Sequence, residues 1–299
     1  MDELSPAAQI IGAVNTIVND NGKLTGHITD GEGFVHNLRD HGIEIKGKKI
    51  TVAGGGGAAT AIQVQCALDG AREISIFNIK DAFFERTLQT AEKIRKAVPE
   101  CVVNVYDIAD IAKMTEEIQS SDIFANATIV GMKPMDDQSV VKDLSAFRPG
   151  LVVADAVYNP EETKLLREAK EAGCTCIGGK GMLLWQGVAA FKLYTGQDMP
   201  VEDVKKLFFQ LNRNGFIEKM SRQKYFTFAG FLDLGNIINI ISGETQSILC
   251  FPFLLIWIGF IWIFDHCVCR TAGYIGASAF RADRSMNGYG GGNDFSIVL

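Results

Sequence analysis

The stretch KITVAGGGGAATAIQVQCALDG, residues 49–70, determines the fold that the sequence predicts. A short apolar run rich in Ile and Val precedes four glycines, and a longer run with apolar residues at three- to four-residue spacing follows them. The first pattern is typical of a buried strand and the second of a helix. A strand that passes through glycines directly into a helix is a common phosphate-binding unit of α/β proteins.

The glycines fit a dinucleotide fingerprint when they are read as Gly54-x-Gly56-x-x-Ala59. In that pattern the first Gly permits the tight turn, the second lets the backbone approach a pyrophosphate, and a small third residue lets helix and strand pack closely. Asp81 follows the next apolar run, at the place where an acid accepts hydrogen bonds from a ribose diol. The alternative is an ordinary glycine-rich turn in a sheet.

The same alternation continues through residues 49–209. Short runs of Val, Ile and Phe bounded by Gly, Asp or Asn predict strands at 49–54, 73–78, 102–107, 122–128, 150–157 and 173–178. Amphipathic spacing predicts helices at 58–70, 81–98, 112–121 and 162–173. Alternating strands and helices predict an α/β fold with a doubly wound, mostly parallel sheet, in a Rossmann-like NAD(P)-binding domain over residues 32–209.

The two ends of the chain differ from this middle part. Residues 1–48 predict a strand, a turn at Asn21-Gly22 and a helix from about Glu32, with no strand partner visible upstream. Residues 210–299 form an atypical tail in which the alternation stops. Its segment 245–264 is uncharged and long enough to span a bilayer as a helix. A membrane anchor, an extra packed element and a C-terminus read out of frame are the three interpretations of this tail.

Composition excludes several classes of function. The formal net charge is −6 over 299 residues, and no run of Lys or Arg indicates a nucleic-acid surface. The seven Cys are scattered without the companion ligands that a zinc site needs, so no metal is expected. Free thiols favour a reduced compartment, and the opening MDELSPAAQ does not have the pattern of a secretory signal, so we expect the cytoplasm.

Six motifs, taken together, identify a resemblance. IGAVNT, TDGEGF, GGGGAAT, NATIVGM, DAVYNPEET and GMLLWQGVAAF occur in that order within residues 1–209. With them the chain resembles the shikimate dehydrogenase family, and FNIKDAFFE, VGMKP and GMLLWQG make it most similar to the quinate/shikimate branch. The resemblance implies oxidation of a ring hydroxyl of shikimate or quinate to the 3-dehydro ketone, with hydride passing to NAD or NADP. It also allows a homodimer.

The resemblance assigns roles to individual residues. Asp30 matches the Asp of a catalytic Lys–Asp pair, and Asn15, Thr29 and Gln186 match positions that contact substrate or its loop. The cofactor-binding positions carried over are Gly55, Gly56, Gly57, Ala58, Asn78, Asp81, Phe83, Ile129, Ala156 and Gly179. The ordinary alternatives are a turn or helix-capping role for Asp30, a turn role for Asn15 and a surface role for Gln186.

The sequence also departs from the family pattern. The family's Lys partner and a pair of substrate-binding Ser lie in an N-terminal segment that has no match here, so residues 1–31 are expected to be a remnant of the substrate-binding domain. Lys23 is the nearest Lys to Asp30. The alternative function is therefore a catalytically inactive, truncated dinucleotide-binding remnant. Ile79 stands where an Arg often holds the 2′-phosphate of NADP, which favours NAD, while Lys80 allows NADP.

Overall fold

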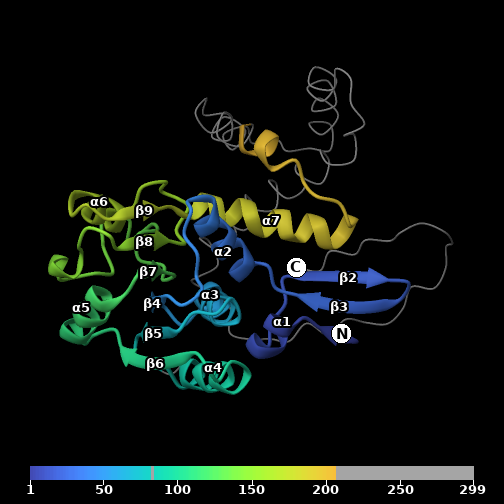
Figure 1. The fold of residues 1–299 in the computed structure, drawn as a ribbon, viewed down its shortest axis with the longest axis horizontal. Helices are drawn as coiled ribbons and strands as arrows, with labels where there is room; N and C mark the ends of the chain where they lie inside the picture. The colour runs from blue at the N-terminus through green and yellow to red at the C-terminus, as the bar shows by residue number, and fades with distance from the viewer. Residues whose placement is uncertain (82–83, 207–299) are drawn as a thin grey trace. The chain divides into compact units, whose positions relative to one another are not determined.

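The computed structural model describes residues 1–81 and 84–206 of the chain. Residues 1–198 form one compact unit, and residues 199–206 belong to a second. The first unit holds two sheets and the helices α1 to α7 (Figure 1). The predicted segment 245–264, the predicted boundary at residue 209 and Phe83 lie outside the described residues. Within residues 1–81 and 84–206, no helix is both long and apolar enough to cross a membrane.

The larger sheet confirms the predicted α/β fold. Its six strands are all parallel and follow the order β6-β5-β4-β7-β8-β9. Their bounds are β4 Lys49–Ala53, β5 Glu73–Asn78, β6 Val102–Asp107, β7 Ile123–Asn126, β8 Val152–Asp155 and β9 Thr175–Ile177. The order reverses between β4 and β7, so the carboxyl ends of these two strands flank the crevice in which such sheets bind ligands.

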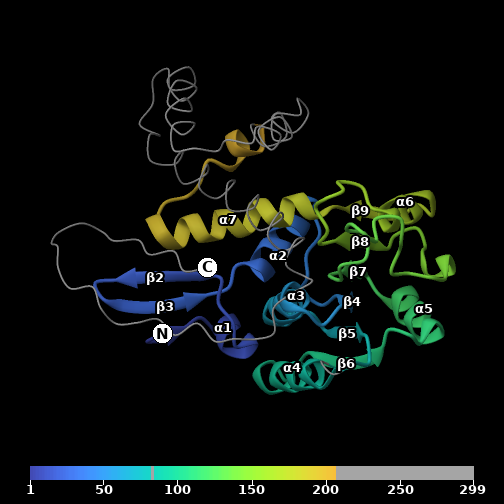
Figure 2. The ribbon, with the colours of Figure 1, turned by 180° about the vertical axis from the view of Figure 1, so that it is seen from behind.

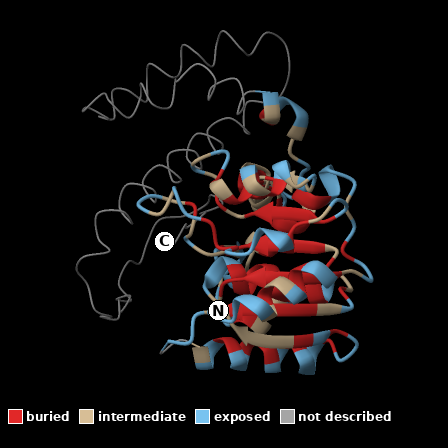
Figure 3. Ribbon diagram, turned by 90° about the vertical axis from the view of Figure 1, so that its left-hand side faces the viewer, coloured by how far each residue is buried: buried red, intermediate tan, exposed pale blue. Residues whose placement is uncertain are grey.

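Helices cover both faces of this sheet, so its four central strands are buried, whereas the edge strands β6 and β9 are partly exposed (Figure 3). The helices are α3 Gly57–Leu68, α4 Phe84–Ala97, α5 Ile111–Ser120, α6 Lys164–Glu171 and α7 Gly179–Thr195, with a 3₁₀ turn, η1, at Leu144–Ala146. Side chains alternate along each strand and so fill two separate cores. Ile50 and Ile76 contribute to one core, and Phe77 and Phe124 contribute to the other.

The first 40 residues contain more structure than the sequence predicted. Two strands, β2 Thr16–Asp20 and β3 Lys23–His27, form a hairpin around the predicted Asn21-Gly22 turn, where both residues have positive φ. A short strand, β1 Glu3–Leu4, runs parallel to β3, and α1 Pro6–Ile11 follows it. The expectation of a single strand without a partner was therefore wrong, because strand pairs this short carry little periodic signal.

Helix α2, Asp30–Asp40, connects the hairpin to β4. It begins two residues before the predicted start, so the proposed domain boundary at residues 31 and 32 falls inside it. Figures 1 and 2 both show α2 running beside α7, with α3 next to it. Asn37 Nδ2 donates to the Gly178 carbonyl oxygen at 3.0 Å, and Trp185 Nε1 donates to Asp40 Oδ2 at 2.7 Å. These contacts hold α2 against the start and the middle of α7.

Candidate functional site

The glycine loop adopts the geometry that its fingerprint predicts. Gly54 has φ 122°, a conformation that L side chains rarely adopt, and a β-carbon there would lie 2.7 Å from the Ala127 carbonyl oxygen. The Gly54 N–H donates to the Phe77 carbonyl oxygen at 2.7 Å, and its own carbonyl oxygen accepts a 2.9 Å hydrogen bond from Gln63 Nε2. Ala59 is fully buried beneath the turn. Gly54 and Ala59 therefore shape the loop.

The next glycines leave space for a ligand. Gly56 is the N-cap of α3 and Gly57 its first residue, and both are exposed, as is Ala58. A β-carbon at Gly56 or Gly57 would meet no heavy atom within 4 Å. The first helical hydrogen bond runs from the Thr60 N–H to the Gly56 carbonyl oxygen, so the preceding N–H groups of α3 point out of its N-terminus. This cradle fits the pyrophosphate of a dinucleotide.

Gly55 and the carboxyl end of β5 form one side of the cradle. Asn78 ends β5, and its Nδ2 donates to Thr87 Oγ1 at 2.9 Å. A β-carbon at Gly55 would overlap both the Asn78 amide and the Thr87 hydroxyl. Asp81 lies three residues farther along and is exposed, as the ribose role requires. Asn78 therefore supports the glycine loop from behind, in addition to the adenosine role predicted for it.

On the other side of the cradle the structure brings Ala156 and Gly179 together. Gly179 opens α7, its N–H donates to the Val157 carbonyl oxygen at 3.3 Å, and an added β-carbon would overlap the Ala156 carbonyl oxygen. Gly179 therefore lets α7 begin directly against the segment that follows β8. Ile129, in the loop after β7, is 67% exposed although it is apolar. An exposed apolar side chain at this edge suits contact with a flat ring.

Asn15, Thr29 and Asp30 form the third part of the site. Asn15 Oδ1 accepts the Thr29 N–H at 3.1 Å, and Asn15 Nδ2 donates to Thr29 Oγ1 at 3.2 Å. These bonds join the residue before β2 to the N-cap of α2. Because Thr29 is the N-cap, Asp30 is the first residue of the helix and not its cap. The capping role considered for Asp30 is therefore wrong.

The environment of Asp30 suits a proton acceptor. Burial raises the pKa of the Asp30 carboxyl above its ordinary value, and a hydrogen bond from Asn15 opposes part of that rise. A carboxylate with a raised pKa is a stronger base than an exposed one. The positive end of the α2 dipole favours the charged form of Asp30, and so it opposes a further part of that rise. Asp30 is thus half-buried, oriented and more basic than an ordinary Asp.

Two glycines allow the first turn of α2, which begins with Asp30, to lie against both α3 and α7. A β-carbon at Gly31 would overlap the Ala61 carbonyl oxygen of α3. A β-carbon at Gly33 would lie 2.6 Å from the Met182 carbonyl oxygen and 2.7 Å from the Gln186 backbone nitrogen. The first turn of α2 therefore fits between α3 and α7 because Gly31 and Gly33, the residues that face these helices, have no side chains. Gln186, predicted to contact substrate, lies on the face of α7 that touches this turn.

No Lys or Arg among the described residues forms an ion pair with Asp30. Lys23 lies at the opposite end of β3, where its Nζ is 2.7 Å from Glu3 Oε1. It is therefore excluded as the partner of Asp30 in this arrangement. Residues 1–81 and 84–206 also contain no cluster of three His, Cys, Asp or Glu side chains that could hold a metal ion.

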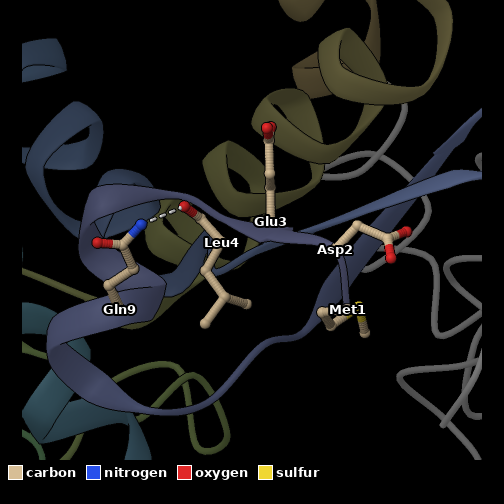
Figure 4. A pocket seen from close by; sticks show the side chains of 5 residues that line it. All are labelled: Met1, Asp2, Glu3, Leu4 and Gln9. Atoms are coloured by element: carbon tan, nitrogen blue, oxygen red, sulfur yellow. Dashed lines mark hydrogen bonds between the residues drawn. The ribbon is translucent and has the colours of Figure 1, made fainter.

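An open pocket lies elsewhere, around β1. It is lined by Met1, Asp2, Glu3, Leu4 and Gln9 (Figure 4). Gln9 Nε2 donates to the Leu4 carbonyl oxygen at 2.9 Å, so the one amide in the pocket already has a partner. None of these residues belongs to the glycine cradle or to the Asn15–Thr29–Asp30 cluster, and the pocket does not enter the functional argument.

Sequence reasoning missed two sets of residues. One is the pair Gly31 and Gly33, whose signal was two glycines inside a helical segment, where Gly is costly without a packing reason. The other is a buried group around Asp155, which ends β8. Its signal was an acid directly after an apolar strand, at the edge where parallel strands present functional groups.

Comparison with protein families gives one match. Residues 179–207 match the family described as the shikimate 5′-dehydrogenase C-terminal domain. This segment contains α7 and its Gln186. It begins at Gly179, the residue whose lack of a side chain lets α7 start against Ala156.

Curated and solved relatives cover a longer stretch. The chain is 50% identical over 209 residues to shikimate dehydrogenase (NADP(+)) of Listeria monocytogenes serotype 4b strain F2365, covering 70% of this chain and 72% of the relative. It is 49% identical over 207 residues to the quinate/shikimate dehydrogenase of Escherichia coli O139:H28 strain E24377A, covering 69% and 72%. The crystal structure of shikimate 5-dehydrogenase from Listeria monocytogenes with shikimate and NAD superimposes with a TM-score of 0.68 at 50% identity, covering 70% of this chain and 72% of that chain.

Proposed function

The chain belongs to the shikimate dehydrogenase family, and from that premise we propose that it oxidises a ring hydroxyl of shikimate or quinate to the 3-dehydro ketone with NAD or NADP. The observation that carries the proposal is that α3, which begins at the Gly55–Ala58 cradle, packs against α2, which begins with Asp30, a half-buried residue whose pKa burial raises. The nicotinamide, when bound, accepts the hydride from the alcohol carbon. The residues of the chain bind both molecules and manage the hydroxyl proton.

Asp30 holds the substrate hydroxyl and takes part in removing its proton. Oxidation of a secondary alcohol requires that proton to leave as the hydride leaves, and a positioned base contributes about 10²–10⁴-fold. Asn15 and Thr29 fix the backbone at the start of α2, which orients the Asp30 carboxylate. Gln186 lies on the α7 face that abuts the same turn and offers its amide to the ring substituents.

In this proposal the cofactor binds to the residues that the resemblance assigns to it. The exposed N-terminus of α3 at Gly56, Gly57 and Ala58 binds the pyrophosphate, and Asp81 accepts hydrogen bonds from the ribose of NAD. Ile79 is 55% exposed and carries no charge, which leaves a 2′-phosphate without the expected Arg and favours NAD. Lys80 is exposed nearby and allows NADP binding.

A second candidate function is a dinucleotide-binding protein without dehydrogenase activity. The observation that favours it is the lack of a cationic partner for Asp30 among the described residues. A carboxylate without that partner orients a hydroxyl but transfers its proton less effectively. The two candidates share the cofactor site and differ in turnover, so they are separated by experiment.

The deciding experiment combines calorimetric titration of the full chain with NAD and NADP and an assay of reduced cofactor formed from shikimate and from quinate. The dehydrogenase proposal predicts turnover that Asp30→Asn lowers about 10²–10⁴-fold. The control is Asp20→Asn, an exposed carboxylate at the hairpin turn that accepts a hydrogen bond from Asn21. Cofactor binding without turnover would establish the second candidate, and no binding of either cofactor would contradict both.

We also propose that residues 1–31 are part of a substrate-binding domain, that the chain forms a homodimer and that it resides in the cytoplasm. The four described cysteines, Cys66, Cys101, Cys174 and Cys176, are all free thiols, which supports a reduced compartment. Light scattering of the purified chain tests the dimer, and microscopy of a tagged chain tests the location.

A further inference from the structure

Asp155 is a buried carboxyl at the carboxyl end of β8 that has no role in the proposed chemistry so far. Its side chain is 2% exposed. Oδ1 accepts from Asn126 Nδ2 at 2.9 Å and from the Val157 N–H at 3.0 Å, and Oδ2 accepts from the Thr163 hydroxyl at 2.7 Å. Burial raises the pKa of Asp155 to about 6, although these three hydrogen bonds lower it. Burying a carboxyl group costs free energy of folding, so we ask what the Asp155 carboxyl does at this position.

Asn126 extends this group into the loop that follows β7. Its Nδ2 also donates to the Val130 carbonyl oxygen at 3.1 Å, and its Oδ1 accepts from the Thr128 hydroxyl at 2.7 Å and from the Thr128 N–H at 3.1 Å. The Thr128 hydroxyl oxygen accepts the Val130 N–H at 3.1 Å. Ile129 is therefore held between two residues whose polar groups are tied to Asn126.

Thr163 and Val157, which both hydrogen-bond to Asp155, connect it to the starts of helices α6 and α7. Thr163 is the N-cap of α6, and its hydroxyl oxygen accepts the Leu166 N–H at 3.3 Å. Its methyl carbon would lie 3.2 Å from a β-carbon at Gly131, so it also packs against the loop after β7. The Val157 carbonyl oxygen accepts the N–H of Gly179, the first residue of α7. Asp155 thus links two strand ends, one loop and two helix starts.

The position of this group in the sheet gives it a function. A dinucleotide crosses the crevice where the strand order reverses, with one nucleotide over each half of the sheet. Here the reversal lies between β4 and β7, and Asp81 with Asn78 marks the β5 side as the adenosine half. The nicotinamide half therefore lies over the carboxyl ends of β7 and β8, where Ile129 and Ala156 are held by the Asp155 group.

We propose that Asp155 is a positioning residue that fixes the loops after β7 and β8 as the seat of the nicotinamide ring. The proposal rests on the proposed function in that it requires NAD or NADP to bind at the glycine cradle. Asp155 does not touch the reacting atoms. It acts through Asn126 on the loop that carries Ile129, and through the Val157 backbone on the segment that carries Ala156 and meets Gly179.

The test compares two ligands that share the adenosine half of the cofactor. NADH carries the nicotinamide ring and ADP-ribose lacks it, so the ratio of their dissociation constants reports the nicotinamide seat. We expect the full-length wild type to bind NADH at least about tenfold more tightly than ADP-ribose. Asp155→Ala is expected to bring this ratio close to one while leaving the dissociation constant of ADP-ribose within about twofold. NADH bound to Asp155→Ala should also no longer show the change in dihydronicotinamide fluorescence that binding to the wild type produces.

Further variants separate positioning from general loss of structure. Asp155→Asn keeps the oxygen that accepts from Asn126 and Val157, so it should retain most of the ratio. Thr163→Val removes one donor, keeps the side-chain volume and should lower the ratio partly, which covers the case in which Asp155→Ala does not fold. Asp143→Ala is the control, because Asp143 also accepts from a loop N–H, that of Ser145, but lies outside the site. A melting curve is recorded for each variant.

Two results would overturn the proposal while leaving the cofactor site intact. One is a wild type that binds NADH and ADP-ribose equally. The other is an Asp155→Ala or Thr163→Val variant that folds and keeps the wild-type ratio. A wild type that binds neither ligand would contradict the proposed function itself, and the inference with it.

Discussion

Gly31 in the first turn of α2 lies directly against the Ala61 carbonyl oxygen in α3. A β-carbon at position 31 would overlap that oxygen and would lie 2.6 Å from the Gln65 β-carbon. The oxygen belongs to a helix backbone and cannot move aside as a flexible side chain can. The turn that begins with Asp30 is therefore held at a fixed distance from the helix that begins at the glycine cradle.

Gly31→Ala is expected to lower the free energy of unfolding by about 1–3 kcal/mol, because it forces α2 and α3 apart. It should lower turnover more than NAD affinity, since Asp30 moves with α2 while the cradle moves little. Chemical denaturation and titration with NAD measure the two effects. Gly57→Ala, which would meet no atom within 4 Å, is the control for stability. Equal unfolding of Gly31→Ala and wild type would show that α2 is not tightly packed there.

Gly56→Ala is expected to leave the melting temperature unchanged and to weaken NAD binding at least about tenfold. Gly56 has φ −77°, which Ala adopts without strain, and an added β-carbon meets open space. The added methyl group would then obstruct the pyrophosphate of the cofactor and no part of the protein. Calorimetry with NAD measures the effect, and unaltered affinity would place the pyrophosphate away from this loop.

Asp81→Ala is expected to weaken NAD binding by about 1–3 kcal/mol, the cost of leaving the hydrogen-bonding groups of the ribose unpaired. NADP should lose less or even gain affinity, because its 2′-phosphate is no longer near a carboxylate. Titrations with both cofactors give the change in preference. Asp107→Ala, which removes the acid at the end of the neighbouring strand β6, is the matched control. The same loss for NAD and NADP would argue against a ribose contact.

Glu117 is expected to stabilise the fold at neutral pH through a buried ion cluster. Its oxygens lie 2.8 Å from Lys49 Nζ, 2.8 Å from Lys113 Nζ and 2.7 Å from the Ser75 hydroxyl oxygen. Burial alone would raise the pKa of Glu117, but hydrogen bonds from Lys113, Lys49 and Ser75 outweigh it and lower that pKa to about 2 from an ordinary 4.5. The stabilisation is therefore complete above pH 4.5 and is lost as the pH falls toward about 2.

The matching variant is Glu117→Gln, which should lower the free energy of unfolding by about 3 kcal/mol at neutral pH. This is the low end for breaking a buried ion pair, because Lys49 keeps Glu73 as a partner. The difference from wild type should shrink as the pH falls below 4.5. Urea denaturation across this pH range measures it. Glu116→Gln removes an exposed partner of the same Lys113 and should change stability by less than about 1 kcal/mol. A wild type equally stable across this pH range would contradict the assignment.

The sequence predicted those parts of the fold that depend on local pattern. The strands from β4 to β9 are short segments rich in Val, Ile, Phe and Ala that lie between turn residues. The positive φ of Gly54 follows from its place as the first Gly of the fingerprint, where the turn is tight. The hairpin was only half predicted, because β2 and β3 are exposed along much of their length and their apolar alternation is weak. Short strands of this kind depend on partners that lie elsewhere in the chain.

The resemblance named most residues of the candidate site, but not the contacts that connect them. The resemblance pointed to Asn15, Thr29 and Asp30, and only the structure shows that Asn15 orders the start of α2 through Thr29. The partners of Asp155 come from β7 and α6. Such contacts join segments from different elements through the positions of their side chains, and a local sequence pattern does not predict those positions. The predicted roles of Gln186, Ile129 and Ala156 stay predictions until ligands are tested.

The pairing of α2 with α7 has a consequence for the order in which the protein folds. The bond from Asn37 to Gly178 spans 141 residues of sequence, and that from Trp185 to Asp40 spans 145. Closing so long a loop costs chain entropy before any contact repays it, whereas β4, α3 and β5 are joined by short connections. We therefore expect the nucleotide cradle to form early. The surroundings of Asp30 are completed only when α7 arrives, so binding competence precedes catalytic competence along the folding path.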